Sequence, residues 1–233
     1  PYAASTSNDT RVTATLGEGA SPGRFAINTT ALASNHKLSS GAYASDAAVG
    51  TGTLNFTVGG ESFSVVIDAT NNTLEGIRDA INTASGNSKV TAAVINSTTG
   101  ARLLLSATDS GAANAITVAI TGDGDGSDTN ASGLSALSYT AGALRLTQRS
   151  AAQDAALTID GIAVSSPSNN VSTAIDGVTF NLLATGTATI TISRDNSAIT
   201  KAAQDFAQAY NDLRDAIAKL RAGDLASDSS LRT

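Results

Sequence analysis

Apolar and polar residues alternate along most of this chain, and a period of two predicts short β-strands joined by turns. The clearest hairpin spans residues 50–69, where Gly59-Gly60 supplies a two-residue turn that accepts positive φ. A second hairpin is predicted over residues 155–164, around Asp160-Gly161. Further strands are expected within residues 1–45 and at residues 89–96, 102–107, 115–121, 178–183 and 188–193.

Two short helices are predicted, one after each hairpin. Asn72 is the expected cap of the first, with Glu75 as its reciprocal capping-box partner. The second helix is expected at Val171–Ile175, so the hairpin and helix would form a repeated unit. The alternative is that common hairpin chemistry arose twice without a duplication. Residues 122–142 are rich in Gly, Ser and Asp and predict a loop with one short apolar turn near Leu134.

From Ser197 to Leu220 the apolar period changes to alternating steps of four and three residues, which predicts an a/d seam over about three heptads. A helix alone cannot bury such a stripe. We therefore expect it to pair with a further segment or with another subunit. The predicted seam residues are Ile199, Ala203, Phe206, Tyr210, Leu213, Ile217 and Leu220.

Composition narrows the function classes. The fold class expected is α+β, mainly β, with a coiled-coil-type helix at the C-terminal end, because Thr, Ser, Asn and Gly are abundant and aromatic residues make up only 4% of the chain. The absence of Cys excludes disulfides and thiolate chemistry. The net charge of -6, without a basic cluster, disfavours nucleic-acid binding. No apolar run approaches the roughly 20 residues of a membrane span. The chain begins with Pro1, so we expect it to be a piece of a longer protein.

The candidate chemistry is sparse, and we predict no catalytic residue, no metal site and no cofactor. His36 is the single histidine and is expected to be a surface or strand-end residue. Residues 123–128 resemble a calcium loop, but Asp128 stands where such loops need Gly and Leu134 where they need an acidic residue. A flexible acidic loop is the favoured interpretation, and weak calcium binding the alternative.

Several segments resemble the flagellar hook-associated protein 2 family, the filament cap proteins called FliD. The segments follow the family's order over nearly the whole chain. They are Gly23–Ala33 with Leu38, Thr73–Asn82, Ala151–Gly161, Asn169–Phe180 followed by a strand ending at Asp195, and a helix containing Phe206, Tyr210, Asn211 and Leu213.

The resemblance implies two nested head domains and a leg. Residues 1–48 and 146–195 would form a split domain (D2-like), residues 49–145 an inserted domain (D3-like), and residues 196–233 the truncated start of a helical leg (D1-like). Family members assemble as a cyclic ring of about five subunits at the tip of the growing filament. There the ring helps exported flagellin to fold and insert.

The same resemblance implies the partners and the location. The partners would be further copies of the chain, flagellin and hook–filament junction proteins, with host mucin contacted by some members. The location would be extracellular, after export by the flagellar type III system. The alternative function is a cell-surface or phage adhesin that binds a glycan or receptor through its β-domains. A third hypothesis is another axial flagellar protein, such as flagellin itself.

Overall fold

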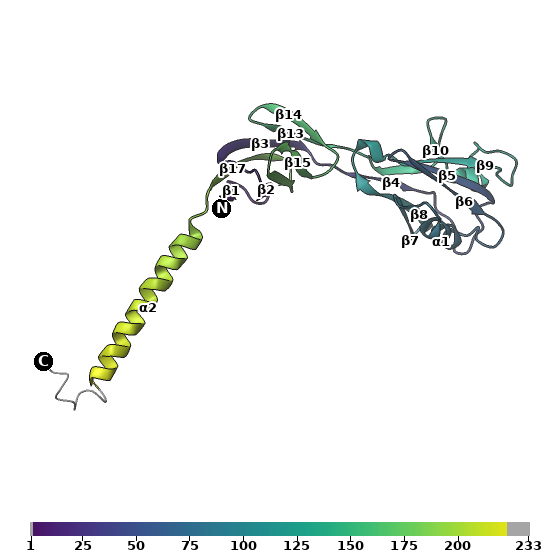
Figure 1. The fold of residues 1–233 in the computed structure, drawn as a ribbon. Coiled ribbons are helices and arrows are strands. Elements are labelled where there is room, and N and C mark those ends of the chain that lie inside the picture. Colours follow the sequence, from purple (N-terminus) through teal and green to yellow (C-terminus); the bar gives the residue numbers. More distant parts are fainter. Residues whose placement is uncertain (1, 223–233) are drawn as a thin grey trace.

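The computed structural model describes residues 2–222, apart from the side chains of residues 198–199 and 220–222. Figure 1 shows two β-rich bodies in a row and a long helix that extends away from one of them. We call the body beside the helix the proximal module (residues 2–33 and 154–195) and the other the distal module (residues 34–153). The predicted fold class, α+β and mainly β with a C-terminal helix, is confirmed.

The proximal module consists of two antiparallel sheets that enclose Phe180, Ile27 and Ile190. The five-stranded sheet contains, in spatial order, β1 (Tyr2–Thr6), β17 (Gly186–Arg194), β3 (Gly23–Ala31), β13 (Ala155–Ile159) and β14 (Ile162–Ser166). The three-stranded sheet contains β15 (Asn170–Ile175), β16 (Val178–Leu182) and β2 (Val12–Leu16).

The distal module also has two sheets, and helix α1 (Leu74–Thr83) packs against three of their strands. One sheet contains β11 (Ala143–Leu144), β10 (Tyr139–Thr140), β9 (Thr117–Thr121), β5 (Gly52–Val58) and β6 (Glu61–Ile67). The other contains β12 (Thr147–Ser150), β4 (Asn35–Ser39), β8 (Gly100–Ser110) and β7 (Val90–Ser97). Two short 3₁₀ helices, η1 (Ala112–Asn114) and η2 (Gly133–Leu137), complete the module.

Each module has its own hydrophobic core, and the two cores share no residue. The distal core is made from one continuous stretch of chain, from Leu38 to Leu146, whereas the proximal core comes from the stretches on either side of it. Strands β4 and β12 belong to the distal sheets, although the expected limits at residues 48 and 146 would place both in the split domain. We therefore propose domain limits near residues 33 and 154.

Both predicted hairpins form. Val58 pairs with Glu61 across Gly59-Gly60, and Ile159 pairs with Ile162 across Asp160-Gly161. Asp160 and Gly161 have φ values of 49° and 85°, as a type I′ turn requires. In these places a local dipeptide signal determines the register of a whole strand pair.

The short helix predicted at Val171–Ile175 is wrong, because this segment is strand β15. Ile175 pairs with Val178 across Asp176-Gly177, which makes a third tight hairpin, and Gly177 has a φ of 71°. The β-branched residues of the segment favour an extended backbone. The unit after the second hairpin is therefore another hairpin, and the predicted strand–turn–strand–helix repeat is also wrong.

The predicted cap of α1 is wrong by one residue. Thr73 is the N-cap, and its hydroxyl accepts a hydrogen bond of 3.2 Å from the backbone N–H of Gly76. The carbonyl of Asn72 instead accepts a hydrogen bond from the N–H of Val49, and Thr73 itself bridges to Ala48. These pairings hold the chain extended through Asn72, so the helix starts later.

His36 lies near the start of β4, in keeping with the expected strand-end position, but its side chain is buried, so the surface position offered as the other possibility is wrong. Its side chain is 2% exposed, and its Nδ1 accepts a 2.8 Å hydrogen bond from the backbone N–H of Ile116. Because Nδ1 is the acceptor, Nε2 carries the proton and donates to Oε1 of Gln148 at 3.2 Å. The same oxygen accepts a 2.9 Å hydrogen bond from the hydroxyl of Tyr139. His36 thus supplies a buried acceptor that links β4 to the start of β9.

Helix α2 (Ser197–Ala222) begins directly after the proximal sheet. The backbone N–H of Ser197 donates to Oδ1 of Asp195 at 2.8 Å, and the N–H of Thr200 donates to the carbonyl of Asn196 at 2.9 Å. Hydrogen bonds from Ser197 lower the pKa of the Asp195 carboxyl below its ordinary value of 3.8. A negative charge at this end of a helix is also favoured by the helix dipole.

Replacing His36 by Ala should destabilise the distal module by about 1–3 kcal/mol, because the N–H of Ile116 would be buried without an acceptor. Chemical denaturation measures the free energy of unfolding. His36→Asn is the matched control, since its side-chain oxygen can still accept from Ile116 and should recover part of the loss. Equal stability of the His36→Ala variant and the unchanged chain would contradict this role.

Acidification should weaken the start of α2 through Asp195. Its pKa is lowered in the folded chain, so its stabilising effect is present above pH 3.8 and is lost as the pH falls through the lowered pKa. Circular dichroism should show a larger loss of helix on acidification in the unchanged chain than in Asp195→Asn, which keeps the acceptor but cannot titrate. Asp195→Ala should have less helix already at neutral pH. Superimposable pH profiles for all three chains would disprove the capping role.

Candidate interaction site on the C-terminal helix

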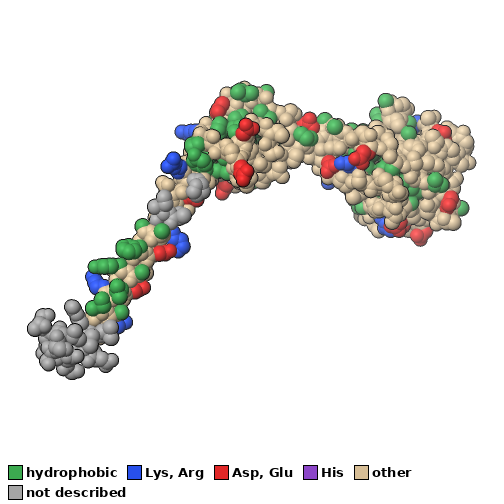
Figure 2. All heavy atoms as spheres, viewed as in Figure 1, with side chains coloured by type: hydrophobic (Ala, Val, Ile, Leu, Met, Phe, Trp, Pro, Cys, Tyr) green, Lys and Arg blue, Asp and Glu red, His purple; other side chains and the backbone are tan. Residues whose placement is uncertain are grey.

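Helix α2 carries a stripe of apolar side chains that face solvent. Every side chain of α2 that the structure describes is exposed. The exposed fractions are 74% for Phe206, 61% for Tyr210, 59% for Leu213 and 44% for Ile217. Figure 2 shows hydrophobic side chains gathered along one side of this helix. Such exposure of large apolar groups in a row marks an interaction surface.

Five of the seven predicted seam residues can be placed on this stripe. At about 100° per residue, they fall within an arc of about 80° around the helix axis. These five are Ala203, Phe206, Tyr210, Leu213 and Ile217. The side chains of Ile199 and Leu220 lie outside the described residues, although both positions belong to α2. The width of the arc is that of a coiled-coil seam, which is narrower than the core face of an ordinary surface helix.

Polar residues occupy the opposite face of α2. Nζ of Lys201 lies 3.1 Å from the carboxylate of Asp205, and Nε2 of Gln208 donates to Asp212 at 2.8 Å. Both pairs are four residues apart and exposed, so each contributes only about 0.2–0.5 kcal/mol. These contacts keep one face of the helix in water but cannot replace the packing that the apolar face lacks.

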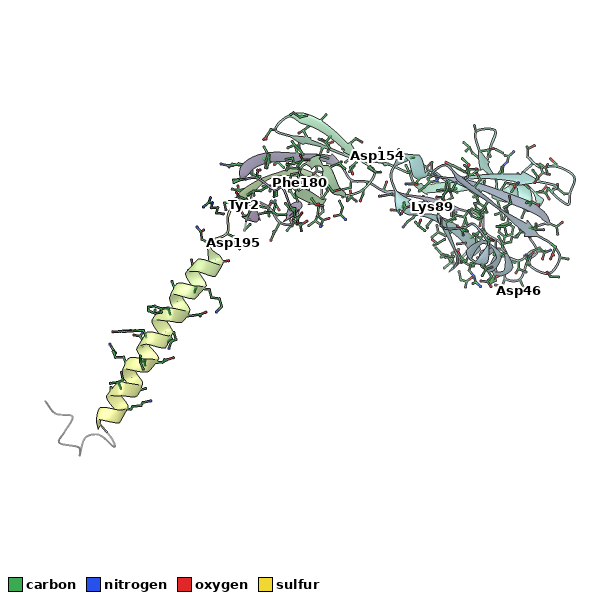
Figure 3. The ribbon with its side chains drawn as sticks, in the orientation of Figure 1. Tyr2, Asp46, Lys89, Asp154, Phe180 and Asp195 are labelled. Carbon is green, nitrogen blue, oxygen red and sulfur yellow. The ribbon has the colours of Figure 1, made fainter. Side chains whose placement is uncertain are left out.

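The chain enters the proximal module beside the start of α2. Strand β1 pairs antiparallel with β17, and its register sets Tyr2 opposite Arg194. Figure 3 shows Tyr2 and Asp195 close to one another at the base of the helix. The first described residue and the first turn of α2 therefore lie at the same end of the same sheet. Sequence patterning did not indicate this pairing, because the two strands are separated by nearly the whole chain.

The acidic loop after β9 is organised around a buried carboxylate. Asp123 is 6% exposed, and its Oδ2 accepts hydrogen bonds from both the N–H and the hydroxyl of Ser135, each at 2.6 Å. Hydrogen bonds from Asn130 and Ser132 lower the pKa of the Asp125 carboxyl. These carboxylates serve the protein's own donors and hold the loop against η2.

Within the described residues 2–222, no three His, Cys, Asp or Glu side chains lie together in a way that could hold a metal ion. Neither α1 nor α2 combines the length and the apolar character that a membrane span needs.

Comparison with known proteins gives consistent matches. The family model for the flagellar hook-associated protein 2 C-terminus (FliD_C) matches residues 152–231. The B-type flagellar hook-associated protein 2 of Pseudomonas aeruginosa PAO1 is 36% identical over 224 residues, which are 90% of this chain and 47% of that protein. The chain thus spans about half the length of the curated relatives it matches.

Solved structures agree with the sequence matches. The D1-D2-D3 domains of the flagellar cap protein FliD from Escherichia coli superpose with a TM-score of 0.74 at 31% identity, covering 100% of this chain and 66% of that one. FliD (HAP2) from Pseudomonas aeruginosa PAO1 superposes with a TM-score of 0.71 at 33% identity, covering 88% of this chain and 94% of that one. On these grounds the chain belongs to the flagellar hook-associated protein 2 family, the FliD flagellar cap proteins.

Proposed function

We propose that this chain is the head region and the beginning of the leg of a structural cap protein at the distal tip of a bacterial flagellar filament. Family membership supports the location at the filament tip. The apolar stripe on α2 supports the proposal that this helix packs against other helices in the leg. The two β-modules form the part that covers the tip, and α2 joins them to a helical leg. The protein acts by holding and placing other chains rather than by catalysis.

The stripe carries the proposal that α2 is part of a helical bundle. Burying a Phe or Leu side chain stabilises a protein by about 1.5–3 kcal/mol. Packing Phe206 and Leu213 against a partner would therefore contribute several kcal/mol of stability that the exposed helix lacks. The β1–β17 pairing supports a specific arrangement of this bundle. Tyr2 lies opposite Arg194, so any chain that precedes it in a longer protein would meet the proximal sheet beside the first turn of α2 and would be placed to pack along the stripe. Further copies of the chain or flagellin are the other candidates for this surface.

The remaining partners follow from the family resemblance. Further copies of the protein would form the ring, and flagellin would fold and insert beneath it. Hook–filament junction proteins would be further partners. The place of action would be extracellular, after export by the flagellar type III system. Contact with host mucin stays a prediction from the resemblance alone. Family membership favours this cap function over the alternative of a separate glycan- or receptor-binding adhesin.

Negative charge on the stripe should abolish filament growth. We expect full-length protein carrying Phe206→Glu and Leu213→Glu to fail to restore filaments in cap-deficient cells, because buried unpaired carboxylates would oppose bundle packing. Filament length by electron microscopy, together with the amount of exported cap protein, measures the effect.

The matched control carries Gln204→Glu and Asn211→Asp, which add the same charge at the same seven-residue spacing on the polar side of α2. This control should restore filaments of ordinary length. Growth supported equally well by both double variants would refute the role of the stripe. Failure of the unsubstituted full-length protein to restore filaments would refute the cap function itself.

A further inference from the structure

Within the described residues, two stretches of chain join the two modules. One leads from β3 to β4 through Ser34, and the other from β12 to β13 through Gln153. These crossings lie side by side, because Ser34 and Gln153 form an antiparallel bridge with hydrogen bonds of 2.9 and 3.2 Å. The hydroxyl of Ser34 also donates to the carbonyl of Ala151 at 2.8 Å. A paired double crossing of this kind is a narrow connection about which two rigid bodies can swing.

A second set of contacts spans the junction away from the crossings. Oδ1 of Asp154, at the start of β13, accepts a 2.7 Å hydrogen bond from the backbone N–H of Ala112 in η1. The hydroxyl of Ser110, at the end of β8, donates to the carbonyl of Pro167 at 2.7 Å. Both hydrogen bonds join the proximal module to the distal module. We call these four residues, together with Gly111 between them, the clasp.

Gly111 fits the clasp closely. It is buried and has a φ of 103°, a backbone conformation that residues other than glycine rarely adopt. A Cβ at this position would lie 2.8 Å from Cβ of Pro167 and 3.1 Å from Oδ1 of Asp154. The distal loop therefore approaches the proximal module closely at the point where the hydrogen bonds cross.

The junction has little apolar packing to hold its angle. The two hydrophobic cores are separate. Beside the clasp lies a crevice of about 470 Å³, lined by polar residues of the distal module and by Pro167 and Ser168 of the proximal module. Lys89 and Asp109 in this crevice pair with each other at 2.7 Å within the distal module and not across the junction. Figure 3 shows Asp154 where the two modules meet, with Lys89 nearby in the distal module.

We propose that the clasp sets the angle between the two modules, and that the distal module swings about the Ser34 and Gln153 crossings when the clasp opens. A few hydrogen bonds at a part-exposed junction open more readily than a packed core, because water can replace each partner. The head of the protein is then two rigid bodies with one preferred arrangement and a low barrier to others. This inference does not depend on the proposed function.

Distances between spin labels test the proposal directly, since the chain has no native Cys. Val66→Cys in the distal module and Ile162→Cys in the proximal module provide a pair across the junction, and both positions are exposed. Leu144→Cys with Val66→Cys provides a pair within the distal module, and Leu183→Cys with Ile162→Cys provides one within the proximal module. Each pair is measured in the otherwise unchanged chain, in Asp154→Ala and in Asp154→Asn.

We expect a narrow distance distribution across the junction in the unchanged chain. Asp154→Ala should broaden and shift it, whereas Asp154→Asn, which keeps an oxygen acceptor for Ala112, should leave it narrow. Ser110→Ala should broaden it further when combined with Asp154→Ala. The pairs within a module should stay narrow throughout. The proposal is overturned if the junction distance is unaffected by Asp154→Ala, or is already as broad in the unchanged chain. Equal broadening within a module would also overturn it, since Asp154 would then support a core rather than an angle.

Discussion

The structure depends most on one unmet constraint, which is that the apolar side chains described along helix α2 face water instead of a packed core. The heptad spacing of apolar residues in α2 predicts packing against another helix, yet the described side chains of α2 pack against nothing. Its exposed polar side-chain pairs are too weak to compensate for the missing burial. A helix of this kind gains most of its stability from packing. The exposed apolar surface of α2 is therefore the surface that we propose contacts a partner.

Unlike α2, the two β-modules bury their apolar residues within themselves. Each closes its own core, with Phe180 central to one and Phe56 stacked on Phe63 at 4.7 Å in the other. Because the distal core comes from one uninterrupted stretch, it can be inserted into the proximal module through only two crossings. The narrow junction and its hydrogen-bonded clasp follow from this topology.

Local signals predicted the elements that depend on a few adjacent residues. The hairpins at Gly59-Gly60 and Asp160-Gly161 form as expected because positive φ at the turn is a property of those residues. Helix α2 could also be predicted from local sequence, because the spacing of its apolar residues alone indicates a helix. The turn at Asp176-Gly177 carries the same kind of signal, and it was missed because the segment before it was interpreted as a helix.

Features that depend on distant residues could not be predicted. His36 is buried by partners 80 and 112 positions away, and nothing near it in sequence indicates them. Asp154 meets Ala112 across 42 positions, and Tyr2 meets Arg194 across nearly the whole chain. The start of α1 moved to Thr73 because Ala48 and Val49 pair with the residues before it. In each of these places the local structure is set by a contact with a distant segment, and local patterns in a single sequence do not reveal which segments meet.

Amide hydrogen exchange across residues 197–222 tests the central claim most directly, by comparing this chain with the full-length protein. If the stripe on α2 needs a partner that the longer protein supplies, these amides will exchange rapidly in the present chain and will be strongly protected in the full-length protein. The amides of the β-modules will exchange alike in both. Equal protection of α2 in the two proteins would contradict the account, because the helix would then gain nothing from the rest of the assembly.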